Sequence, residues 1–238
     1  MILKKKNKFS IKAKNSSWSF GNKVPIKFNE HIKKSVPFYD ESHKLIANLS
    51  DFFVQENSTI YDIGSSTGTF LNNIYKRHNN TKLKLIGIEK VPEMIKEAKK
   101  RSAHKSIKYL KKDIEKIDLK KSDMIVSCFT IQFIKQKTRQ QIINKIYKSL
   151  NWGGGFIMFE KIRGSDARFQ DIFTLIYNDF KLMNGFSEKE ILNKSRSLKG
   201  VMEPFSDFGN RSMLKRAGFK DITTVFQWAC FKGYLSIK

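Results

Sequence analysis

The stretch Tyr61-Asp62-Ile63-Gly64-Ser65-Ser66-Thr67-Gly68 indicates the fold class of this chain. A strand that turns sharply into a helix through glycines lets a ligand approach the backbone closely. Glu89 ends the next apolar run, where its carboxylate can accept hydrogen bonds from both hydroxyls of a ribose. Asp113 follows a third such run, where it can bind the exocyclic amine of adenine. The Asp-x-Gly start, and the lack of the lysine of a phosphate-binding loop, favour S-adenosylmethionine as the ligand.

Short β-branched runs alternate with helical patterns from about residue 50 onward, which is typical of βα units and a mostly parallel sheet. Five strands are expected at 59–63, 83–88, 107–110, 123–130 and 156–160. Helices are expected at 69–77, 92–101 and 137–150, and a turn over 151–155 precedes the fifth strand. Two last strands, 221–227 and 230–237, form an antiparallel pair.

The chain is therefore predicted to be a single S-adenosylmethionine-binding domain over residues 1–238. Its fold class is α/β, a Rossmann-like methyltransferase fold with a mostly parallel seven-stranded sheet and a C-terminal β-hairpin. Residues 1–55 are expected to form an N-terminal helical cap on the ligand side, and residues 56–162 and 203–238 the α/β core. Residues 163–202, with helical patterns at 167–183 and 187–198, read as a helical insertion over the open edge of the sheet. A last helix, 207–217, ends at a glycine.

The composition is that of an ordinary soluble globular protein, with 40% hydrophobic and 29% charged residues among 238. No apolar run is long enough to span a bilayer. The lysine-rich stretch 1–14 has no apolar segment, so it is not expected to be a secretory signal. Cys128 and Cys230 lie in apolar runs and are expected to be reduced. These features predict a cytoplasmic protein.

The strongest compositional signal is the charge, because 46 Lys and Arg residues against 22 Asp and Glu residues give a net charge of +24. Such a charge suits binding to nucleic acid or another polyanion. The lysines are scattered, however, and accompany many isoleucines and asparagines, all of which AT-rich codons encode. This pattern favours genomic drift over a selected surface, and specific direct tRNA binding is not expected. A metal site is not expected either, because His31, His43, His78 and His104 lack metal-ligand spacing.

Two segments carry a more specific signal than the glycine turn. They are Ser35-Val36-Pro37-Phe38-Tyr39 and Asp179-Phe180-Lys181, the latter followed by Asn184-Gly185-Phe186-Ser187. With them, the chain resembles the carboxy-S-adenosylmethionine synthase family of the class I methyltransferase superfamily over most of its length. Further matching stretches are 28–31, 129–133, 156–161, 201–202, Trp228 and Phe231.

The resemblance implies an enzyme, a transferase that uses S-adenosylmethionine and prephenate. Such enzymes place a carboxyl group on the sulfonium methyl to make carboxy-S-adenosylmethionine, and they release phenylpyruvate. The positive sulfur acidifies the adjacent carbon, so that an ylide can capture carbon dioxide without a base from the protein. The product would serve a separate enzyme that carboxymethylates the wobble uridine of tRNA. Family members are homodimers, so a homodimer is expected.

The resemblance also implies ligand contacts, residue by residue. Six positions match the family directly: Tyr39, Gly64, Ser65, Ser66, Asp113 and Ile114. Glu89 replaces the family's usual aspartate, and Lys90 fills the neighbouring contact position. Cys128 stands where the family has asparagine, so an amide contact is lost unless the backbone made it.

The family's arginine that holds the transferred carboxylate aligns with Ser195, and Arg196 comes one residue later. One residue is about 100° of rotation on a helix, so Arg196 needs a local register shift to reach the same point. We expect that shift, which makes Arg196 the catalytic carboxylate-binding residue beside Ser195. Lys194 and Lys199 could supply charge there but not the planar fork of arginine.

Two other functions remain open at this stage. An ordinary S-adenosylmethionine-dependent methyltransferase on the same scaffold would have lost carboxylate selectivity with the arginine, so Arg196 separates it from the first reading. A basic RNA-binding protein with a vestigial S-adenosylmethionine site is supported only by the charge. The intact turn and the lack of an RNA-binding module argue against it. The residues that hold prephenate are not indicated by any motif.

Overall fold

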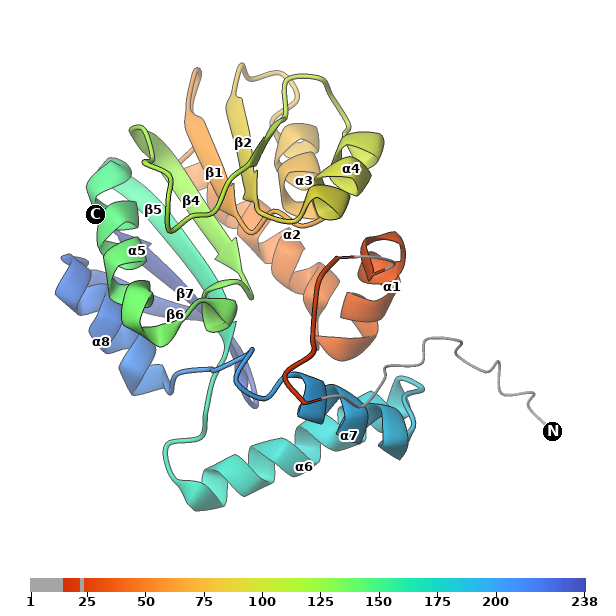
Figure 1. Cartoon of the computed structure of the whole chain (residues 1–238). Helices are drawn as coiled ribbons and strands as arrows, with labels where there is room; N and C mark the ends of the chain where they lie inside the picture. Colours follow the sequence, from red (N-terminus) through yellow and green to blue (C-terminus); the bar gives the residue numbers. More distant parts are fainter. Residues whose placement is uncertain (1–14, 22–23) are drawn as a thin grey trace.

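A seven-stranded sheet forms the centre of the molecule (Figure 1). The computed structural model describes residues 15–21 and 24–238, and within them the strand order is β3-β2-β1-β4-β5-β7-β6. Strands β1 to β5 are parallel, and β7 runs antiparallel to both β5 and β6. The strands are β1 (Thr59–Ile63), β2 (Lys84–Glu89), β3 (Lys108–Lys111), β4 (Ser122–Cys128), β5 (Leu150–Lys161), β6 (Asp221–Trp228) and β7 (Phe231–Ile237). The predicted α/β fold class and the C-terminal hairpin are confirmed.

The turn predicted over 151–155 is wrong, because β5 already begins at Leu150. Gly153 has a positive φ of 74°. The pairing of β5 with β4 shifts register between Ser122 and Met124 of β4 at this point, but β5 does not end there. The backbone of Gly153 and Gly154 instead pairs with Lys238, through N–H···O distances of 2.8 and 3.1 Å. The glycines therefore form an irregular stretch inside a strand that the end of the chain extends.

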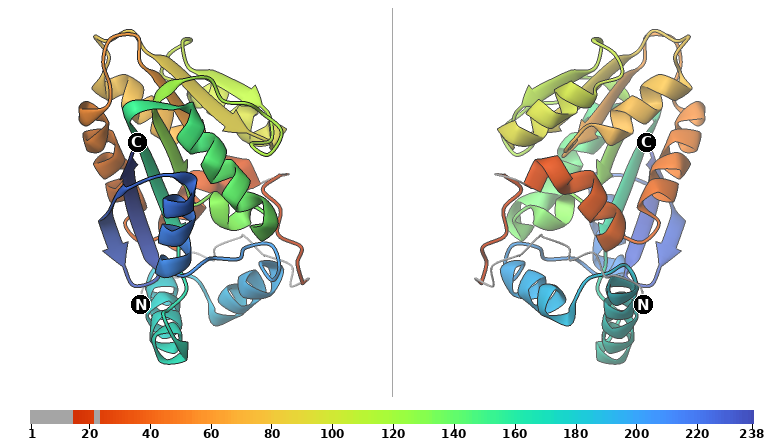
Figure 2. Two further views of the ribbon diagram at one scale, coloured as in Figure 1. Left: turned by 90° about the vertical axis from the view of Figure 1, so that its left-hand side faces the viewer. Right: turned by 90° about the vertical axis from the view of Figure 1, so that its right-hand side faces the viewer.

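Helices cover both faces of the sheet (Figure 2). On one face lie α2 (Tyr39–Leu49), α3 (Thr69–Arg77) and α4 (Pro92–Arg101), and on the other lie α5 (Gln136–Ser149) and α8 (Asp207–Ala217). The middle of β4 is buried on both sides, as a continuous apolar strand of a parallel sheet should be: Met124, Ile125 and Val126 are all fully buried. Two apolar cores, one on each face, result from this layering.

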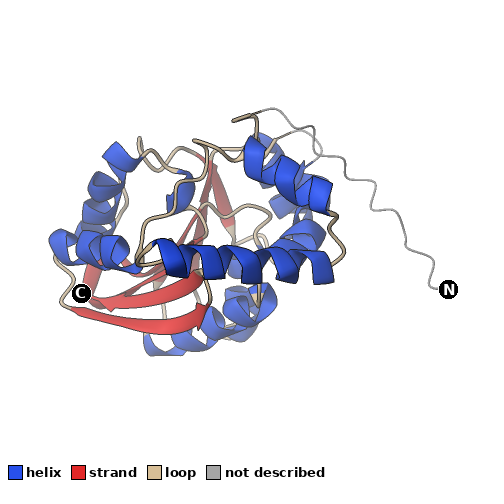
Figure 3. Cartoon of the chain, turned by 90° about the horizontal axis from the view of Figure 1, so that it is seen from below, coloured by secondary structure: helices blue, strands red, loops and turns tan. Residues whose placement is uncertain are grey.

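The cap and the insertion meet across the carboxyl ends of the parallel strands. The cap consists of α1 (Val24–Ser35), α2 and the short η1 (Ser50–Phe52), and the insertion contains α6 (Ala167–Met183) and α7 (Glu188–Ser197). Seen from below, the insertion helices lie in front of the strands (Figure 3). The Tyr177 hydroxyl of α6 donates to the carbonyl oxygen of Ser35 at 2.8 Å, which joins the two parts. The insertion thus covers the carboxyl ends of the parallel strands, and its Phe180 also contacts Trp228 at the end of the edge strand β6, with the ring centroids 5.4 Å apart.

The start of the described chain joins the insertion as well. The backbone N–H groups of Ser16 and Trp18 donate to the carbonyl oxygens of Arg196 and Ser197 at 3.2 and 3.1 Å. The expected helix at the cap begins at Val24, and residues 1–14 and 22–23, which include the lysine-rich stretch, lie outside the described residues.

Within the described part, no helix is long and apolar enough to cross a membrane. Cys128 and Cys230 are free thiols.

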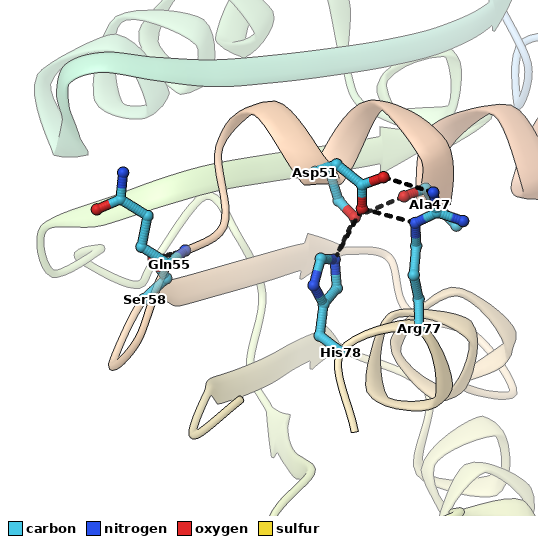
Figure 4. Close-up of polar contacts among 7 residues, drawn as sticks. Ala47, Asp51, Gln55, Ser58, Arg77 and His78 are labelled. Carbon is cyan, nitrogen blue, oxygen red and sulfur yellow. Dashed lines mark hydrogen bonds and ion pairs between the residues drawn. The ribbon is translucent and has the colours of Figure 1, made fainter. Parts of the chain in front are cut away.

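A polar cluster ties the cap to the core (Figure 4). The Arg77 guanidinium at the end of α3 donates through two nitrogens to the Asp51 carboxylate, one of them at 2.7 Å, and this pairing holds the pKa of Asp51 below its ordinary value. Ser50 Oγ lies 2.7 Å from Nε2 of His78. Solvent screens the exposed ion pair, so its main effect is to fix where the cap leaves the core.

Arg139 of α5 is fully buried and bridges two loops near the ends of the strands. Its guanidinium donates to the carbonyl oxygens of Gln132, Ile134 and Glu203 at 3.0, 2.8 and 2.7 Å. It also lies over the Phe205 ring, 4.5 Å from the centroid. The segment that returns from the insertion is thereby fixed to the loop after β4.

We expect Arg139→Leu to lower the free energy of unfolding by roughly 3 kcal/mol, because three buried carbonyl oxygens lose their donor. Urea unfolding followed by circular dichroism measures the loss. Arg101→Leu, at an exposed position at the end of α4, is the control and should change stability by less than about 0.5 kcal/mol. Equal losses in the two variants would contradict the bridging role.

Candidate functional site

A cavity of about 1000 Å³ lies at the carboxyl ends of β1, β2, β4 and β5, beneath the cap and the insertion. The strand order places β1 between β2 and β4, so the connections from β1 and from β4 leave toward opposite faces of the sheet. Open α/β sheets bind ligands in the crevice at such a switch point. The cavity is therefore where the fold class predicts a functional site.

The glycine turn forms the floor of this cavity. Gly64 has a φ of +76°, and a Cβ there would lie 2.2 Å from Oγ1 of Thr130, so the position accepts no side chain. The N–H groups of Gly64 and Ser65 donate to the carbonyl oxygen of Ile88 at 2.8 and 3.2 Å. The buried hydroxyl of Ser65 has no partner within the described chain. Ser66 also lines the cavity. The turn thus presents backbone and one free polar group to a ligand.

The two acids predicted from the strand ends both line the cavity. The buried Glu89 carboxylate accepts hydrogen bonds from the backbone N–H groups of Ser66 at 3.0 Å and Val91 at 2.9 Å. Burial raises the pKa of Glu89, and these bonds oppose that rise. The half-buried Asp113 accepts from the N–H of Glu115 at 3.0 Å. Each carboxylate keeps lone pairs for a ligand, as a ribose and an adenine amine would need.

The remaining positions predicted around the turn are also at the cavity wall. Ile114 is buried, Lys90 is exposed at the rim, and Tyr39 reaches the wall from the first turn of α2. The Cys128 thiol lines the cavity at the end of β4, and its carbonyl oxygen accepts from Oγ1 of Thr130 at 3.2 Å. Burial, then the nearby Asp62 and Glu160 carboxylates, raise the pKa of this thiol. These surroundings therefore disfavour the thiolate form of Cys128, which is the form that acts as a nucleophile.

Buried carboxyl groups shape the same region. Asp62, the start of the Asp-x-Gly motif, lines the cavity, and burial and the Glu89 carboxylate raise its pKa to about 8. Glu160, at the end of β5, accepts from the N–H groups of Ile131 and Gln132, both at 2.9 Å. Oε1 of Gln132 in turn accepts from the N–H of Lys161 at 2.8 Å. This network fixes the loop after β4 against the end of β5.

The structure corrects the expectation for Arg196. Ser195 lines the cavity, whereas Arg196 is exposed and does not belong to the cavity wall. A capping box between Ser187 and Glu190 fixes the start of α7, and the helix continues to Ser197 without the predicted slip. One residue of rotation therefore turns the Arg196 side chain away, and the guanidinium is not in the position expected for it.

Three lysines that the motifs did not single out lie in the cavity instead. Lys161 ends β5, Lys181 belongs to α6 and Lys194 to α7. The Lys161 and Lys181 ammonium nitrogens lie 4.4 and 4.3 Å from the centroid of the Tyr177 ring. The Lys194 ammonium lies 2.7 Å from Nε2 of His31 and 3.1 Å from Oγ of Ser35.

These ammonium groups have no acidic partner, because no carboxylate oxygen of the described residues lies within 4.0 Å of them. Burial, and then the charges of neighbouring lysines, lower the pKa of Lys194 to about 7 and that of Lys181 to about 8. Burial also lowers the pKa of Lys161. The sequence offered little to mark them among 46 basic residues, although Lys161 and Lys181 lie in stretches that carry the family resemblance.

His43 is a second group that the motifs did not single out. It is buried at the cavity wall, its ring lies 4.5 Å from that of Tyr39, and neither ring nitrogen has a partner in the described structure. Burial lowers the pKa of His43 to about 4, so the ring is neutral near pH 7. Among the described residues, no group of three His, Cys, Asp or Glu side chains could hold a metal ion.

Comparison with known proteins gives matches over nearly the whole chain. A family described as "Methyltransferase domain" matches residues 60–154. A carboxy-S-adenosyl-L-methionine synthase from Staphylococcus epidermidis is 40% identical over 93% of this chain and 97% of its own length. One of the same name from Nautilia profundicola is 38% identical over 93% of this chain and 94% of its own length.

Solved structures share the fold. A putative O-methyltransferase from Nostoc punctiforme has a TM-score of 0.64 at 17% identity, over 91% of this chain and 60% of its own. A putative S-adenosyl-L-methionine-dependent methyltransferase from Methanococcus maripaludis has a TM-score of 0.62 at 18% identity, over 94% of this chain and 96% of its own. At these identities the similarity concerns the fold alone.

We expect His43 to make the fold acid-sensitive. The pKa of His43 is about 4 in the folded chain and 6.5 as a free side chain, so the unfolded state binds the proton first as the pH falls. Between pH 7 and pH 5, the wild type should lose about 2 kcal/mol more unfolding free energy than His43→Leu. Urea unfolding at both pH values measures this difference. His43→Gln, which is polar but does not titrate, should behave as the leucine variant does, and a pH dependence equal to the wild type's in either variant would contradict the assignment.

Proposed function

Because the chain belongs to the carboxy-S-adenosyl-L-methionine synthase family of S-adenosylmethionine-dependent transferases, we propose that it converts S-adenosylmethionine and prephenate to carboxy-S-adenosylmethionine and phenylpyruvate. One observation carries this proposal beyond family membership. The cavity has acids and a glycine turn over β1 to β3, and lysines without acidic partners over β5 and the insertion. Such a cavity suits a nucleoside beside an anionic second substrate.

The residues present fit S-adenosylmethionine. Glu89 would accept from the ribose hydroxyls, Asp113 would accept from the adenine amine, and the Gly64 turn would let the ligand lie against backbone. The free Ser65 hydroxyl gives a further polar contact. Bound S-adenosylmethionine supplies a sulfonium whose positive charge acidifies the protons of the neighbouring methyl group. No buried group of the chain must act as a nucleophile, which agrees with the neutral Cys128 thiol.

The atoms of the proposed reaction balance without an oxidant or a metal. Prephenate loses its ring carboxyl group and its ring hydroxyl as it becomes phenylpyruvate. The carboxyl carbon forms a bond to the former methyl carbon, and the proton displaced from that carbon leaves with the hydroxyl as water. The task of the protein is to hold both substrates, to exclude solvent and to offset the negative charge. The cap and insertion cover the cavity, and the lysines supply the charge.

The test is to incubate the purified protein with S-adenosylmethionine and prephenate and to identify the nucleoside product by mass. The expected mass exceeds that of S-adenosylmethionine by one carbon dioxide. Glu89→Ala should weaken S-adenosylmethionine binding at least about 100-fold in calorimetry, since two charge-assisted hydrogen bonds of about 1.5 kcal/mol each are lost. Glu41→Ala, at an exposed position of α2, is the matched control and should bind as the wild type does.

Two outcomes would contradict the proposed ligand contacts or the proposed reaction. If the Glu89→Ala variant binds S-adenosylmethionine normally, the ribose is held elsewhere. If the wild type binds S-adenosylmethionine but makes no carboxylated product, an ordinary methyltransferase becomes the better interpretation. The position of Arg196 outside the cavity is the observation that favours this second candidate. An RNA-binding function has only the net charge of +24 in its support.

We place the proposed enzyme in the cytoplasm, in keeping with its two free thiols. Its product would be the donor for a separate enzyme that carboxymethylates the wobble uridine of tRNA, so the chain itself needs no specific tRNA contact.

We further propose a homodimer through α6. Six large apolar side chains on this helix are substantially exposed, and they are Phe169, Ile172, Leu175, Ile176, Leu182 and Met183. Leu175 is 65% exposed. Their spacing gathers them along one side of a helix about 25 Å long. Exposed apolar patches of this kind mark contact sites, and a two-fold axis lets one patch cover its own copy.

We expect Leu175→Glu to shift the protein from dimer to monomer, because the introduced carboxylate would be buried in the contact. Sedimentation velocity at micromolar concentration measures the shift. Phe208→Glu replaces an apolar residue on α8 that is even more exposed than Leu175 and should leave the dimer intact. A monomeric wild type, or a dimer that persists in Leu175→Glu, would refute this interface.

A further inference from the structure

Three ammonium groups meet on one side of the cavity although their residues are distant in sequence. Lys161 comes from β5, Lys181 from α6 and Lys194 from α7. The Tyr177 ring joins the first two, and its hydroxyl bond to the Ser35 carbonyl fixes the ring against α1. β5 lies two strands from β1 in the sheet, which is about 10 Å. Lys161 therefore lies beside the glycine turn and not at the turn itself, and the shared contact with Tyr177 keeps Lys181 close to it.

This arrangement is unfavourable without a bound anion. Cations removed from water lose hydration, and a nearby carboxylate usually restores the balance. Glu160 is next to Lys161 in sequence, but its carboxylate accepts from the N–H groups of Ile131 and Gln132. The charged groups acting on Lys194 are Lys181 and Lys161, which repel it. An anionic ligand in the cavity would supply the missing negative charge, whereas without one burial and mutual repulsion lower the pKa values of these lysines.

Neighbouring side chains orient Lys194. Burial, then the charge of Lys194, lower the pKa of His31 to about 3, so its ring is neutral and Nε2 can accept from the ammonium group. Oγ of Ser35 is a second acceptor, and the Trp18 ring centroid lies 5.2 Å from the ammonium nitrogen. His31 and Ser35 are thus positioning residues that hold the ammonium group at the cavity wall, one residue before Ser195.

We propose that Lys161, Lys181 and Lys194 form the carboxylate-binding subsite for the second substrate, and that Lys194 supplies the cation missing at Ser195. The identity of that substrate as prephenate rests on the proposed function. Prephenate carries two carboxylates, so the pair of lysines at Tyr177 can hold one and Lys194 the other. An ammonium group has three rotatable donors and does not require the planar approach of a guanidinium, so a neighbouring helix position can serve.

The first test uses lysine-to-methionine variants at the three positions. The protein is loaded with S-adenosylhomocysteine, which has no methyl group to carboxylate, and titrated with prephenate in a calorimeter. Each variant should bind prephenate at least about 30-fold more weakly, the loss expected when a buried charge loses its partner. Affinity for S-adenosylmethionine should change less than about twofold, because the lysines lie away from Glu89. Lys189→Met, at an exposed position of α7, is the control, and Lys194→Arg should retain binding.

A second measurement needs no variant. Phenylpyruvate has one carboxylate fewer than prephenate and should bind the loaded wild type at least about tenfold more weakly. Equal affinity for the two acids, or prephenate binding unchanged in all three methionine variants, would overturn the subsite. If the lysines govern prephenate binding but the wild type makes no carboxy-S-adenosylmethionine, the subsite stands and the proposed function fails. If the product forms with an unaltered KM for prephenate in the variants, the function stands and the subsite fails.

Discussion

The site depends on the close approach between the turn after β1 and the segment after β4. Gly64 can adopt its positive φ beside Thr130 only because it has no Cβ. On the other side, the Glu160 carboxylate accepts hydrogen bonds from the N–H groups of Ile131 and Gln132. These bonds fix the segment that contains Thr130, so it cannot move away from Gly64. The floor of the cavity is therefore made of backbone held by buried polar contacts, and side chains enter only at its walls.

The walls differ in charge because they come from different parts of the fold. Glu89 ends β2 and Asp113 follows β3, while Lys161, Lys181 and Lys194 come from β5 and the two insertion helices. Partial burial strengthens the electrostatic interaction of both the acidic and the basic side chains with a ligand, because charges removed from water interact through a lower dielectric. A ligand with donors at one end and carboxylates beyond the other would complement this distribution.

The net charge of +24 says less about function than these few lysines do. Most basic residues are scattered over the chain, and salt screens charges at the surface beyond about 8 Å. The cavity lysines are less hydrated and have no carboxylate close by, so their charge is available to a ligand. The position and burial of a charged group, and not the net charge of the chain, determine whether that group can take part in catalysis.

The sequence by itself determined the order of the strands, the glycine turn and the positions of Glu89 and Asp113, but not where β5 begins. Helical and strand periodicities are local, and a residue that ends a parallel strand must lie at the ligand edge of the sheet. The helix Ala167–Met183 was likewise predictable from its pattern. Only the tertiary structure decided that Lys194 and not Arg196 faces the cavity, because packing against the cap selects the inward side of α7. The same holds for the meeting of Lys161 with Lys181 at Tyr177, because β5 and α6 have local signals of their own but only contacts with the cap and the hairpin decide how they lie together.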